Sequence, residues 1–348
     1  MCPSHYLFYD AHMKTIVFRV AAFESIGIGH LVRCFALAQQ FRQQGLTCRF
    51  LLTEAAAAIA NQLDNFNFPI TTIRSQNALT GELDSIHSVA NENDWLVIDG
   101  YEFSAAYRQQ LSELGFKLLW LDDWAEPEPA HVAAILNSGA GVTANAYQHQ
   151  PTGTKLFLGP AYHPLRPEFF KQPYRKARDC EALSIIFGGS DPANLMTSIA
   201  TVLSADSNFR ELPLQFICGP AYQRLDELEA LLADQPNWQL LHNPSNIAEA
   251  LNNSRLVVTA CGSTTFECWA LGRPMIAVQV AGNQQAQAQH LAEQELAEVY
   301  QAADFIKHCH RACQRYFDHA WLAQAQQRQS QQACGSKLAD IGKWLSEH

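Results

Sequence analysis

The chain has no excess of basic residues: among its 348 residues, 34 Asp and Glu outnumber 24 Lys and Arg, and the formal net charge is −10. Proteins that bind nucleic acid through its phosphates need clusters of Lys and Arg. The composition therefore argues against nucleic acid as a partner. A small phosphate ligand stays open, because backbone N–H groups at a helix N-terminus bind anions without a basic side chain.

Long hydrophobic runs and paired cysteines are also missing. No segment approaches the roughly 18 uninterrupted apolar residues of a transmembrane helix, and Met1–Tyr6 lacks the basic segment that opens a signal peptide. The ten cysteines are scattered, and several lie in apolar runs where a free thiol behaves as a small hydrophobic group. We therefore expect a reduced, cytoplasmic protein without membrane insertion.

Short apolar segments alternate with longer helical patterns along the whole chain, and the length favours two domains over one. Continuous apolarity is typical of strands buried on both faces of a parallel sheet. Alternation of such strands with helices indicates a doubly wound α/β fold. The expected strands are Thr15–Arg19, Cys48–Leu52, Trp95–Ile98, Lys117–Leu121, Ala133–Leu136, Lys155–Leu158, Ser184–Phe187, Leu214–Cys218, Trp238–Leu241, Leu256–Thr259 and Met275–Gln279.

The clearest predicted helix follows the first strand and is expected to end at Gly45, a typical C-terminal residue. Apolar residues recur on one stripe of this helix at the spacing of a buried face. The residues of that stripe are Leu31, Cys34, Phe35, Ala38 and Phe41.

Prolines and charged residues interrupt the strand–helix pattern between Tyr162 and Cys180, which we interpret as a linker. It separates a predicted N-terminal Rossmann-like domain, residues 14–165, from a second such domain, residues 181–320. The Gln-rich segment beyond contains tolerable helix formers, so residues 321–348 are predicted to form a C-terminal helical region. Residues 1–12 are expected to be a loose extension.

The segment Gly27-Ile28-Gly29-His30 joins the first strand to the first long helix. Glycines allow the backbone to approach a ligand, and the free N–H groups of a helix N-terminus attract anions. Ligands of open α/β sheets gather at the carboxyl ends of the strands, which favours His30 as a site residue. A capping or packing histidine is the alternative.

A second segment, Gly262-Ser263-Thr264, opens the helix that follows strand Leu256–Thr259. Its amides and hydroxyls can donate to a diphosphate, aided by the helix dipole. Glu267 lies one turn further on, where a carboxylate can accept hydrogen bonds from ribose hydroxyls. The alternative is an ordinary capping box of Ser or Thr with Glu.

Two further loops could face a ligand. Gly188-Gly189-Ser190 follows the first strand of the second domain and permits close approach, although a turn with Asp191 as the N-cap is an equal alternative. Asn283 and Gln284 follow strand Met275–Gln279, and their amides could bind sugar hydroxyls. These loops face His30 only if the two domains close on a cleft.

Two other groups are weaker candidates. Asp122-Asp123 after a strand could suggest a metal pair, but one such carboxylate usually caps the next element. His308, Cys309, His310 and Cys313 have metal-ligand types at helical spacing, but no second Cys/His pair lies at zinc-finger distance. We interpret this second group as part of a helix surface.

Taken together, these segments resemble the UDP-sugar hydrolases of pseudaminic acid biosynthesis, within the GT-B nucleotide-sugar superfamily. The likeness runs from about Lys14 to the C-terminal helix and rests on the order and spacing of the motifs. They are Phe18-Arg19, Ile26-Gly27-Ile28-Gly29-His30, Arg33-Cys34, Val97-Ile98-Asp99 with Tyr101, Leu121-Asp122-Asp123, Leu158–Tyr162, Leu165–Phe169, Phe187–Asp191, Ala260–Glu267 and Asn283-Gln284.

The resemblance implies two Rossmann-like domains facing a cleft, with a C-terminal helix that packs back towards the first. It implies hydrolysis of a UDP-linked diacetamido-trideoxy sugar with inversion, without a metal or other cofactor, and with His30 activating water. It places Arg19, Gly29, Tyr101, Asn283 and Gln284 with the substrate sugar, and Gly188, Gly189, Ser190, Gly262, Ser263, Thr264 and Glu267 with the nucleotide.

The chain departs from that family at two places. The family usually has Arg-x-Asp-x-Ser after the first strand, whereas Arg19 is followed by Val20-Ala21-Ala22, and it usually has Asp-His-Tyr where this chain has Asp99-Gly100-Tyr101. A glycosyltransferase of the same fold, in which His30 deprotonates an acceptor hydroxyl, is therefore a second hypothesis. A nucleotide-sugar-binding protein without turnover is a third.

Overall fold

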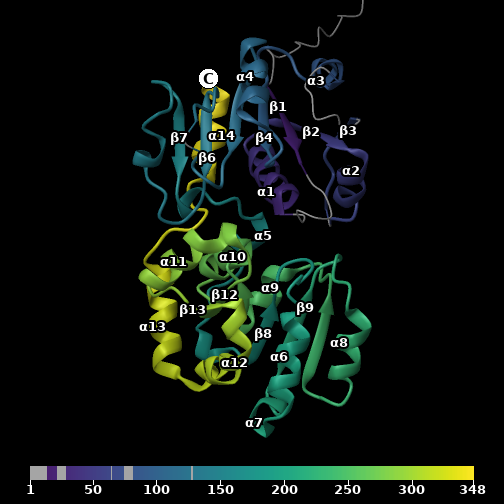
Figure 1. The fold of residues 1–348 in the computed structure, drawn as a ribbon, viewed down its shortest axis with the longest axis vertical. Coiled ribbons are helices and arrows are strands. Elements are labelled where there is room, and N and C mark those ends of the chain that lie inside the picture. Colours follow the sequence, from purple (N-terminus) through teal and green to yellow (C-terminus); the bar gives the residue numbers. More distant parts are fainter. Residues whose placement is uncertain (1–13, 22–28, 64, 74–80, 127) are drawn as a thin grey trace, which may run out of the picture.

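The computed structural model describes all residues except 1–13, 22–28, 64, 74–80 and 127. The predicted N-terminal extension and the Ile26-Gly27-Ile28 part of the histidine motif lie outside the described residues. Two parallel sheets, each with helices on both faces, lie one above the other in Figure 1. This confirms the expected α/β fold.

The first sheet has the strand order β3-β2-β1-β4-β5-β6-β7, and all its neighbours are parallel. Val20 pairs with Asp99, so the carboxyl ends of β1 and β4 lie side by side. The strands are β1 Thr15–Val20, β2 Thr47–Thr53, β3 Ile70–Ile73, β4 Trp95–Asp99, β5 Lys117–Leu121, β6 Ala134–Asn137 and β7 Lys155–Leu158. The helices are α1 Gly29–Gln43, α2 Glu54–Ala60, α3 Leu83–Val89, α4 Ala105–Glu113 and the 3-10 turn η2 Ala144–Tyr147.

Strand β1 shows how side-chain alternation divides the core of this domain. Ile16, Phe18 and Val20 belong to the hydrophobic cluster that includes α1 and α2. Val17 and Ala21 belong to the cluster on the other face, which includes residues of α3 and α4. A side chain at position 19 therefore points to the face of α3 and α4, which decides where Arg19 lies.

The second sheet repeats the same topology in the order β10-β9-β8-β11-β12-β13, again all parallel. Its strands are β8 Ala182–Ile186, β9 Leu214–Cys218, β10 Trp238–His242, β11 Ser254–Ala260, β12 Met275–Gln279 and β13 Glu298–Gln301. Its helices are α6 Leu195–Ser204, α7 Ser207–Arg210, α8 Leu225–Leu232, α9 Ile247–Asn252, α10 Ser263–Ala270, η5 Gly282–Gln284, α11 Gln285–Glu293, α12 Ala302–Cys313, η6 Gln314–Phe317 and α13 His319–Ser330.

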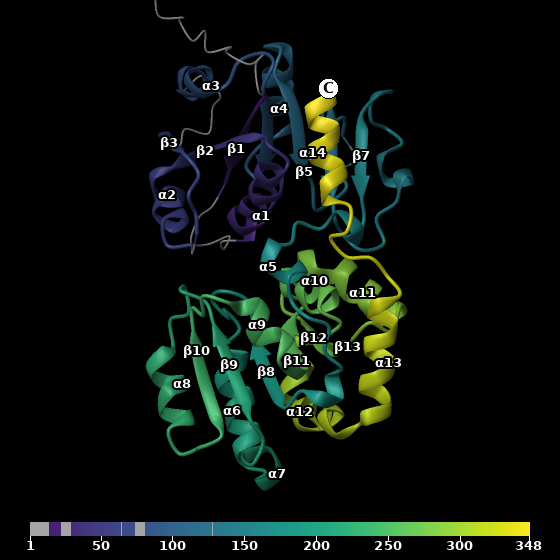
Figure 2. The same cartoon turned by 180° about the vertical axis from the view of Figure 1, so that it is seen from behind.

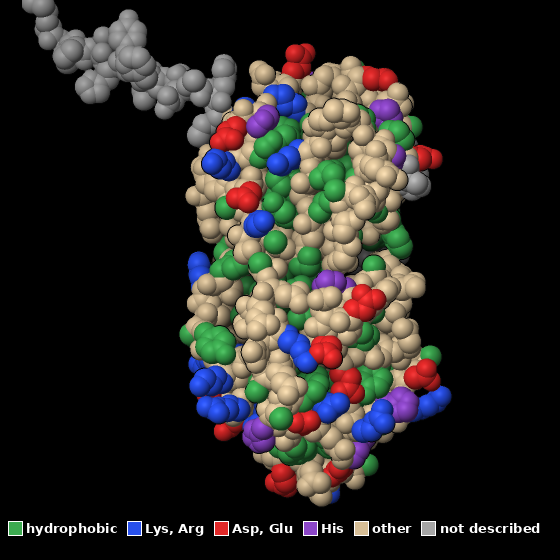
Figure 3. Space-filling view, turned by 90° about the vertical axis from the view of Figure 1, so that its left-hand side faces the viewer, with side chains coloured by type: hydrophobic (Ala, Val, Ile, Leu, Met, Phe, Trp, Pro, Cys, Tyr) green, Lys and Arg blue, Asp and Glu red, His purple; other side chains and the backbone are tan. Residues whose placement is uncertain are grey.

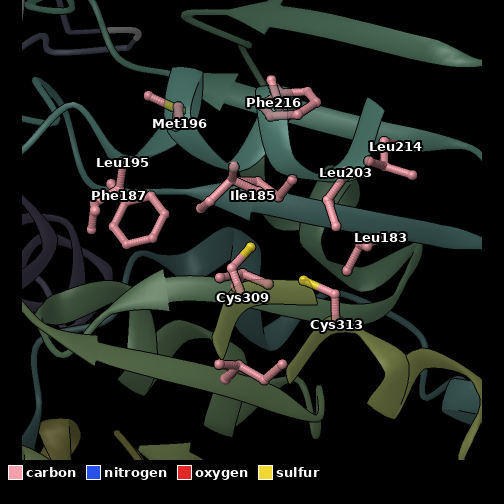
Figure 4. Close-up of a cluster of buried hydrophobic side chains, with 14 of the residues drawn as sticks. Leu183, Ile185, Phe187, Leu195, Met196, Leu203, Leu214, Phe216, Cys309 and Cys313 are labelled. Atoms are coloured by element: carbon pink, nitrogen blue, oxygen red, sulfur yellow. The ribbon is translucent and has the colours of Figure 1, made fainter. Parts of the chain in front are cut away.

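Cys309 and Cys313 do not lie on a helix surface, so that prediction was wrong. Both thiols are buried in the core between α12 and the sheet, beside Leu183 and Ile185 (Figure 4). The reason is periodicity: with Phe305 one turn earlier, the cysteines form the apolar stripe of an amphipathic helix. A free cysteine fills such a stripe as a small hydrophobic residue.

The chain passes twice between the sheets. The first passage contains η3 Pro160–Tyr162, α5 Pro167–Phe170 and η4 Ala177–Asp179. The second returns from α13 and leads into the last helix, α14 Leu338–Glu347. The passages are joined by hydrogen bonds of 2.9 Å that the amides of Gly335 and Lys337 donate to the carbonyls of Pro160 and Ala161.

Helix α14 packs on the first sheet, as the resemblance implies (Figures 1 and 2). Leu338, Ile341 and Leu345 are buried in the cluster that contains α1. The indole N–H of Trp95 donates to the Leu345 carbonyl at 3.0 Å. The C-terminus of the chain is therefore part of the first domain's core, although the residues between β8 and α13 belong to the second.

All expected strands form, and the structure adds two, β3 and β13, which lie at sheet edges. Both are half-buried and mix polar with apolar residues, so they lack the continuous apolarity of buried strands. No helix in the described part of the chain has the length and apolarity to cross a membrane. On the face drawn in Figure 3, acidic and basic side chains are interspersed over both domains.

Candidate active site

The central feature of the site is a contact between His30 and Asp99. His30 is the second residue of α1, and Asp99 is the last residue of β4. The imidazole Nδ1 lies 2.7 Å from the Asp99 Oδ1, and the side chain of Asp99 is fully buried. Asp99 is a closer partner than the Arg33 Nη2, which lies 3.0 Å from the same Nδ1. A carboxylate only accepts hydrogen bonds, so the Asp99 contact favours the tautomer with the proton on Nδ1 and the lone pair on Nε2.

Arg33 and Asp123 extend this network of charges. Arg33, one turn after His30, donates from Nε to Asp99 at 2.7 Å and from a terminal nitrogen to Asp123 at 2.6 Å. Burial alone would raise the pKa of the Asp99 carboxyl, but the charge of Arg33 and the hydrogen bonds with Arg33 and His30 outweigh it and hold that pKa well below its usual range. Asp99 is therefore ionised at any working pH and can orient the imidazole.

Tyr101 lies between the histidine and the second domain. Its ring meets the His30 ring edge-on at 4.7 Å between centroids, and its hydroxyl donates to Asp123 at 3.0 Å. Burial and the charge of Asp123 raise the pKa of Tyr101 to about 12, although a hydrogen bond with the Asn283 side chain opposes this rise. Asn283 of the second domain therefore lies near enough to influence the Tyr101 hydroxyl.

Arg19 lies away from this cluster. Only 2% of it is exposed, and its guanidinium donates to both oxygens of Glu82 at 3.0 and 2.8 Å. It also stacks over the Phe103 ring at 4.7 Å. Position 19 points to the α3–α4 face of the sheet, where Arg19 forms a buried ion pair with Glu82. The expected contact of Arg19 with the sugar stays a prediction.

The two departures from the family pattern, Ala21 and Gly100, lie against each other. A Cβ atom at Gly100 would come within 2.3 Å of the Ala21 Cβ, and Gly100 has a φ of +153°. Ala21 is buried in the cluster that also contains Phe103. The two substitutions are thus one packing arrangement beneath the site, in which an alanine takes the space of a side chain at position 100.

On the second domain, the start of α10 lies at the carboxyl end of β11. Gly262 precedes the helix, Ser263 is exposed and Thr264 is half-buried. The first amides of a helix have no intrahelical acceptors, so those of Ser263 and Thr264 can bind an anion. The amide of Gly262 is already used, since it donates to the Ala260 carbonyl at 2.8 Å.

Glu267 does not form the alternative capping box, because the N-cap of α10 is Gly262 and makes no side-chain capping bond. Its carboxylate instead accepts a hydrogen bond of 3.3 Å from Arg166, in the passage between the sheets. Burial raises the pKa of the Glu267 carboxyl, and the charge of Arg166 partly offsets this. Arg166 also pairs with Glu168 at 3.2 Å.

The loop after β8 contains the predicted glycine-rich segment and the predicted capping residue Asp191. Gly188 and Ser190 are exposed at the carboxyl end of the sheet. Gly189 and Gly219 pack closely against each other: a Cβ added at Gly219 would lie 2.5 Å from the Gly189 Cα. Asn194, and not Asp191, is the N-cap residue of α6. The Asp191 carboxylate nevertheless accepts hydrogen bonds from the first amides of this helix, those of Leu195 and Met196.

Asn283 and Gln284 have different environments within η5. Asn283 is exposed and reaches Tyr101, as described above. Gln284 accepts a hydrogen bond of 2.9 Å from the Val280 amide, which closes its own loop, and its side-chain nitrogen lies near Gly262. The loops after β11 and β12 therefore support each other.

Two contacts from the first passage fix how the domains meet. The ring of His163 stacks on that of Phe266 in α10 with 3.7 Å between centroids, and its Nδ1 lies 2.9 Å from the Ser138 hydroxyl.

A groove of about 580 Å³ lies between the domains. Its lining includes Val32, Phe35 and Gln39 of α1, Arg166 and Glu168 of the passage, and Asn243–Asn246 after β10.

Asp122 supports the fold, as a capping carboxylate should. It accepts hydrogen bonds from the Trp124 amide at 2.8 Å and from the Tyr147 hydroxyl at 2.6 Å. Asp123 is paired with Arg33. Across the ranges that the structure describes, no group of three or more His, Cys, Asp or Glu side chains is arranged to hold a metal ion.

Four residues of the site were not predicted as site residues: Asp99, Arg33, Asp123 and His163. The first three were visible as polar residues after buried strands or one helical turn after His30, which is a usable signal. His163 carries no such signal, because its importance comes from the long-range contact with Phe266.

Comparison with known proteins identifies the fold class. The family described as Glycosyltransferase family 28 C-terminal domain matches residues 184–343. MurG of Acinetobacter baumannii superimposes with a TM-score of 0.66 at 17% identity, over 96% of this chain and 100% of that one. A UDP-glucosyltransferase of Polygonum tinctorium superimposes with a TM-score of 0.64 at 12% identity, over 97% and 100%. The chain therefore has the GT-B fold.

Relatives found by sequence indicate which GT-B proteins this chain is related to. The chain is 25% identical to the UDP-2,4-diacetamido-2,4,6-trideoxy-beta-L-altropyranose hydrolase of Campylobacter jejuni, over 80% of this chain and 96% of that protein. It is 20% identical to the spore coat polysaccharide biosynthesis protein SpsG of Bacillus subtilis, over 78% and 79%. An uncharacterized protein of Methanocaldococcus jannaschii is 26% identical over 72% of this chain, which spans about half of that protein (52%). The chain is a GT-B protein related to a UDP-sugar hydrolase and to a polysaccharide biosynthesis protein.

Proposed function

We propose that this protein hydrolyses a UDP-sugar, releasing UDP and a free diacetamido-trideoxy sugar, as a step of pseudaminic acid biosynthesis. The observation that carries the proposal is the His30–Asp99 contact of 2.7 Å at the N-terminus of α1. The sugar is suggested by the 25% identity to the Campylobacter jejuni hydrolase over nearly the whole length of that protein.

In the proposed reaction, His30 is the catalytic base. Asp99 holds the proton on Nδ1, so Nε2 can take a proton from a water molecule as its oxygen attacks the anomeric carbon. The bond from that carbon to the phosphate oxygen breaks, and UDP leaves with the electron pair. Attack from the face opposite the leaving group inverts the anomeric centre. Tyr101 and Asn283 lie where the sugar would sit between the domains.

The second domain holds the leaving group in this proposal. The amides of Ser263 and Thr264 and the positive end of the α10 dipole stabilise the charge on the diphosphate. Gly188 and Ser190, in the loop after β8, lie at the same carboxyl end of the sheet and would also face the diphosphate. Glu267 accepts hydrogen bonds from the ribose, with Arg166 limiting the cost of its buried charge.

The groove between α1 and the loop after β10 suits the nucleoside end of the substrate. Amide and hydroxyl groups of Asn243, Ser245 and Asn246 line it, and Arg166 connects it to Glu267. Polar groups that donate and accept in a concave site can bind the edge of a uracil base.

The test is to incubate purified protein with a panel of UDP-sugars, including the diacetamido sugar and UDP-GlcNAc, and to measure UDP release without an acceptor. Release of UDP from the diacetamido compound supports hydrolysis. Binding of UDP without release from any compound, with or without an acceptor, contradicts an enzymatic role.

A glycosyltransferase activity is the second candidate, and one observation favours it: the matched family and the structural neighbours described above include glycosyltransferases. In this case His30 deprotonates an acceptor hydroxyl in place of water. UDP release that requires an added sugar acceptor would select this function over hydrolysis.

A further inference from the structure

An exposed aromatic pair lies at the edge of the candidate site. The rings of Tyr101 and Trp124 are 6.0 Å apart between centroids, and 46% and 56% of these residues are exposed. Tyr101 also touches His30, with 4.7 Å between the ring centroids. Trp124 follows β5 and has no role in the function proposed above. Single exposed aromatics need no explanation, but a pair beside a candidate base does.

The backbone holds Trp124 in place. Its amide donates to the Asp122 carboxylate at 2.8 Å, and Asp122 is itself bound by the Tyr147 hydroxyl. The next residue, Ala125, has a φ of +53°, which L-residues seldom adopt and which fixes the turn. The exposed indole is therefore carried by an ordered turn, and a ligand that covers it needs to order little of the chain.

The groups beside this aromatic pair indicate which part of a ligand could pack on it. The carboxylate of Asp123, the residue before Trp124, already accepts hydrogen bonds from Arg33 and Tyr101. Ala21 and Gly100 supply no polar group on the same side of the domain. The available surface is thus aromatic, with Asn283 as the polar neighbour of Tyr101. The C–H face of a sugar ring, or its methyl and acetyl groups, packs on such a surface, whereas a phosphate does not.

We infer that Trp124 and Tyr101 form an aromatic wall against which the sugar of the nucleotide-sugar lies, which makes Trp124 a specificity-determining residue. The inference rests on the proposed function for the identity of the ligand. Trp124 acts on the sugar alone, because the groups proposed for UDP lie on the second domain and in the groove.

The experiment measures the affinity of wild type, Trp124→Ala and Trp124→Phe for UDP and for the UDP-diacetamido sugar by calorimetry, with UDP release followed in parallel. We expect Trp124→Ala to weaken binding of the UDP-sugar and raise its KM about threefold to tenfold, the range of one aromatic contact. UDP affinity should stay unchanged, and Trp124→Phe should retain most of the sugar affinity. Phe317→Ala is the matched control, since Phe317 is a similarly exposed aromatic (48%) in the second domain.

Equal loss of affinity for UDP and for the UDP-sugar in Trp124→Ala, or no loss for either, would overturn the inference. If wild type binds the UDP-sugar but releases no UDP, the hydrolase proposal fails while the affinity comparison still decides the role of Trp124. If wild type binds neither compound, both proposals fail.

Discussion

Asp99 contacts His30 across 69 positions of sequence, with 2.7 Å between Oδ1 and Nδ1. The contact exists because β1 and β4 are neighbours, with Val20 opposite Asp99, so the strand end and the first turn of α1 meet. A buried carboxylate behind a histidine fixes its tautomer and stabilises the charge it gains when it accepts a proton.

Replacing either member of this pair should reduce turnover without weakening UDP binding. We expect His30→Ala and Asp99→Asn each to lower kcat by roughly 10²-fold to 10⁴-fold, the usual contribution of a positioned base. UDP affinity by calorimetry should be retained, because the proposed phosphate donors lie in α10. If Asp99→Asn changed KM alone, Asp99 would not position the base.

Glu267→Ala should weaken UDP binding by about tenfold or more, since hydrogen bonds to a charged group contribute roughly 1.5–3 kcal/mol. Calorimetric titration with UDP checks this. Glu298→Ala is the matched control, because Glu298 is a partly buried carboxylate that also pairs with an arginine, Arg315 at 2.6 Å, outside the groups proposed for UDP. An equal loss of UDP affinity in the two variants would mean that Glu267 makes no specific contact with the nucleotide.

Gly100→Ala should destabilise the protein by about 1–3 kcal/mol, because its Cβ would overlap that of Ala21 and the backbone favours glycine there. Denaturant unfolding measures the loss. In an Ala21→Gly background the penalty should be smaller, which gives a favourable coupling energy in a double-mutant cycle. Gly153→Ala is the control for backbone strain alone, since Gly153 has a φ of +103° and no neighbour within 4 Å. Equal penalties in both backgrounds would contradict direct packing of the two positions.

The stability of the junction between the domains should fall in acid through His163. Burial and the nearby charge of Arg33 lower the pKa of His163 to about 3, below the value of about 6.5 in an unfolded chain. The unfolded state therefore binds the extra proton first, and the free energy of unfolding decreases as the pH falls from about 6.5 to about 3. His163→Phe keeps the stack on Phe266 but cannot titrate, so its unfolding free energy should depend less on pH over this range.

His163→Ala serves as the control for the last prediction, because it removes both the stack and the titrating group. It should be less stable than His163→Phe at neutral pH but share its weaker pH dependence. A pH dependence of His163→Phe identical to that of wild type would assign the acid sensitivity to other groups.

Much of the fold follows from local patterns. The runs that became β5, β6 and β12 are largely apolar, and such runs fit strands buried on both faces of a parallel sheet. The apolar stripe of α1 follows from helical periodicity, and its end at Gln43, two residues before Gly45, follows from the glycine's φ of +85°. Strands β3 and β13 lack this signal, because polar residues interrupt the few apolar residues of each.

The sequence by itself determined where loops follow strands, and hence that His30, Gly262 and Asn283 would gather at the carboxyl ends of two sheets. Only the tertiary structure decided which side chains meet there. Arg19 was directed to Glu82 by the alternation of β1, Glu267 was paired with Arg166 from the passage, and Asp99 was placed behind His30. These contacts depend on strand order, face and domain packing, which are set by residues far apart in the chain, and no local pattern records them.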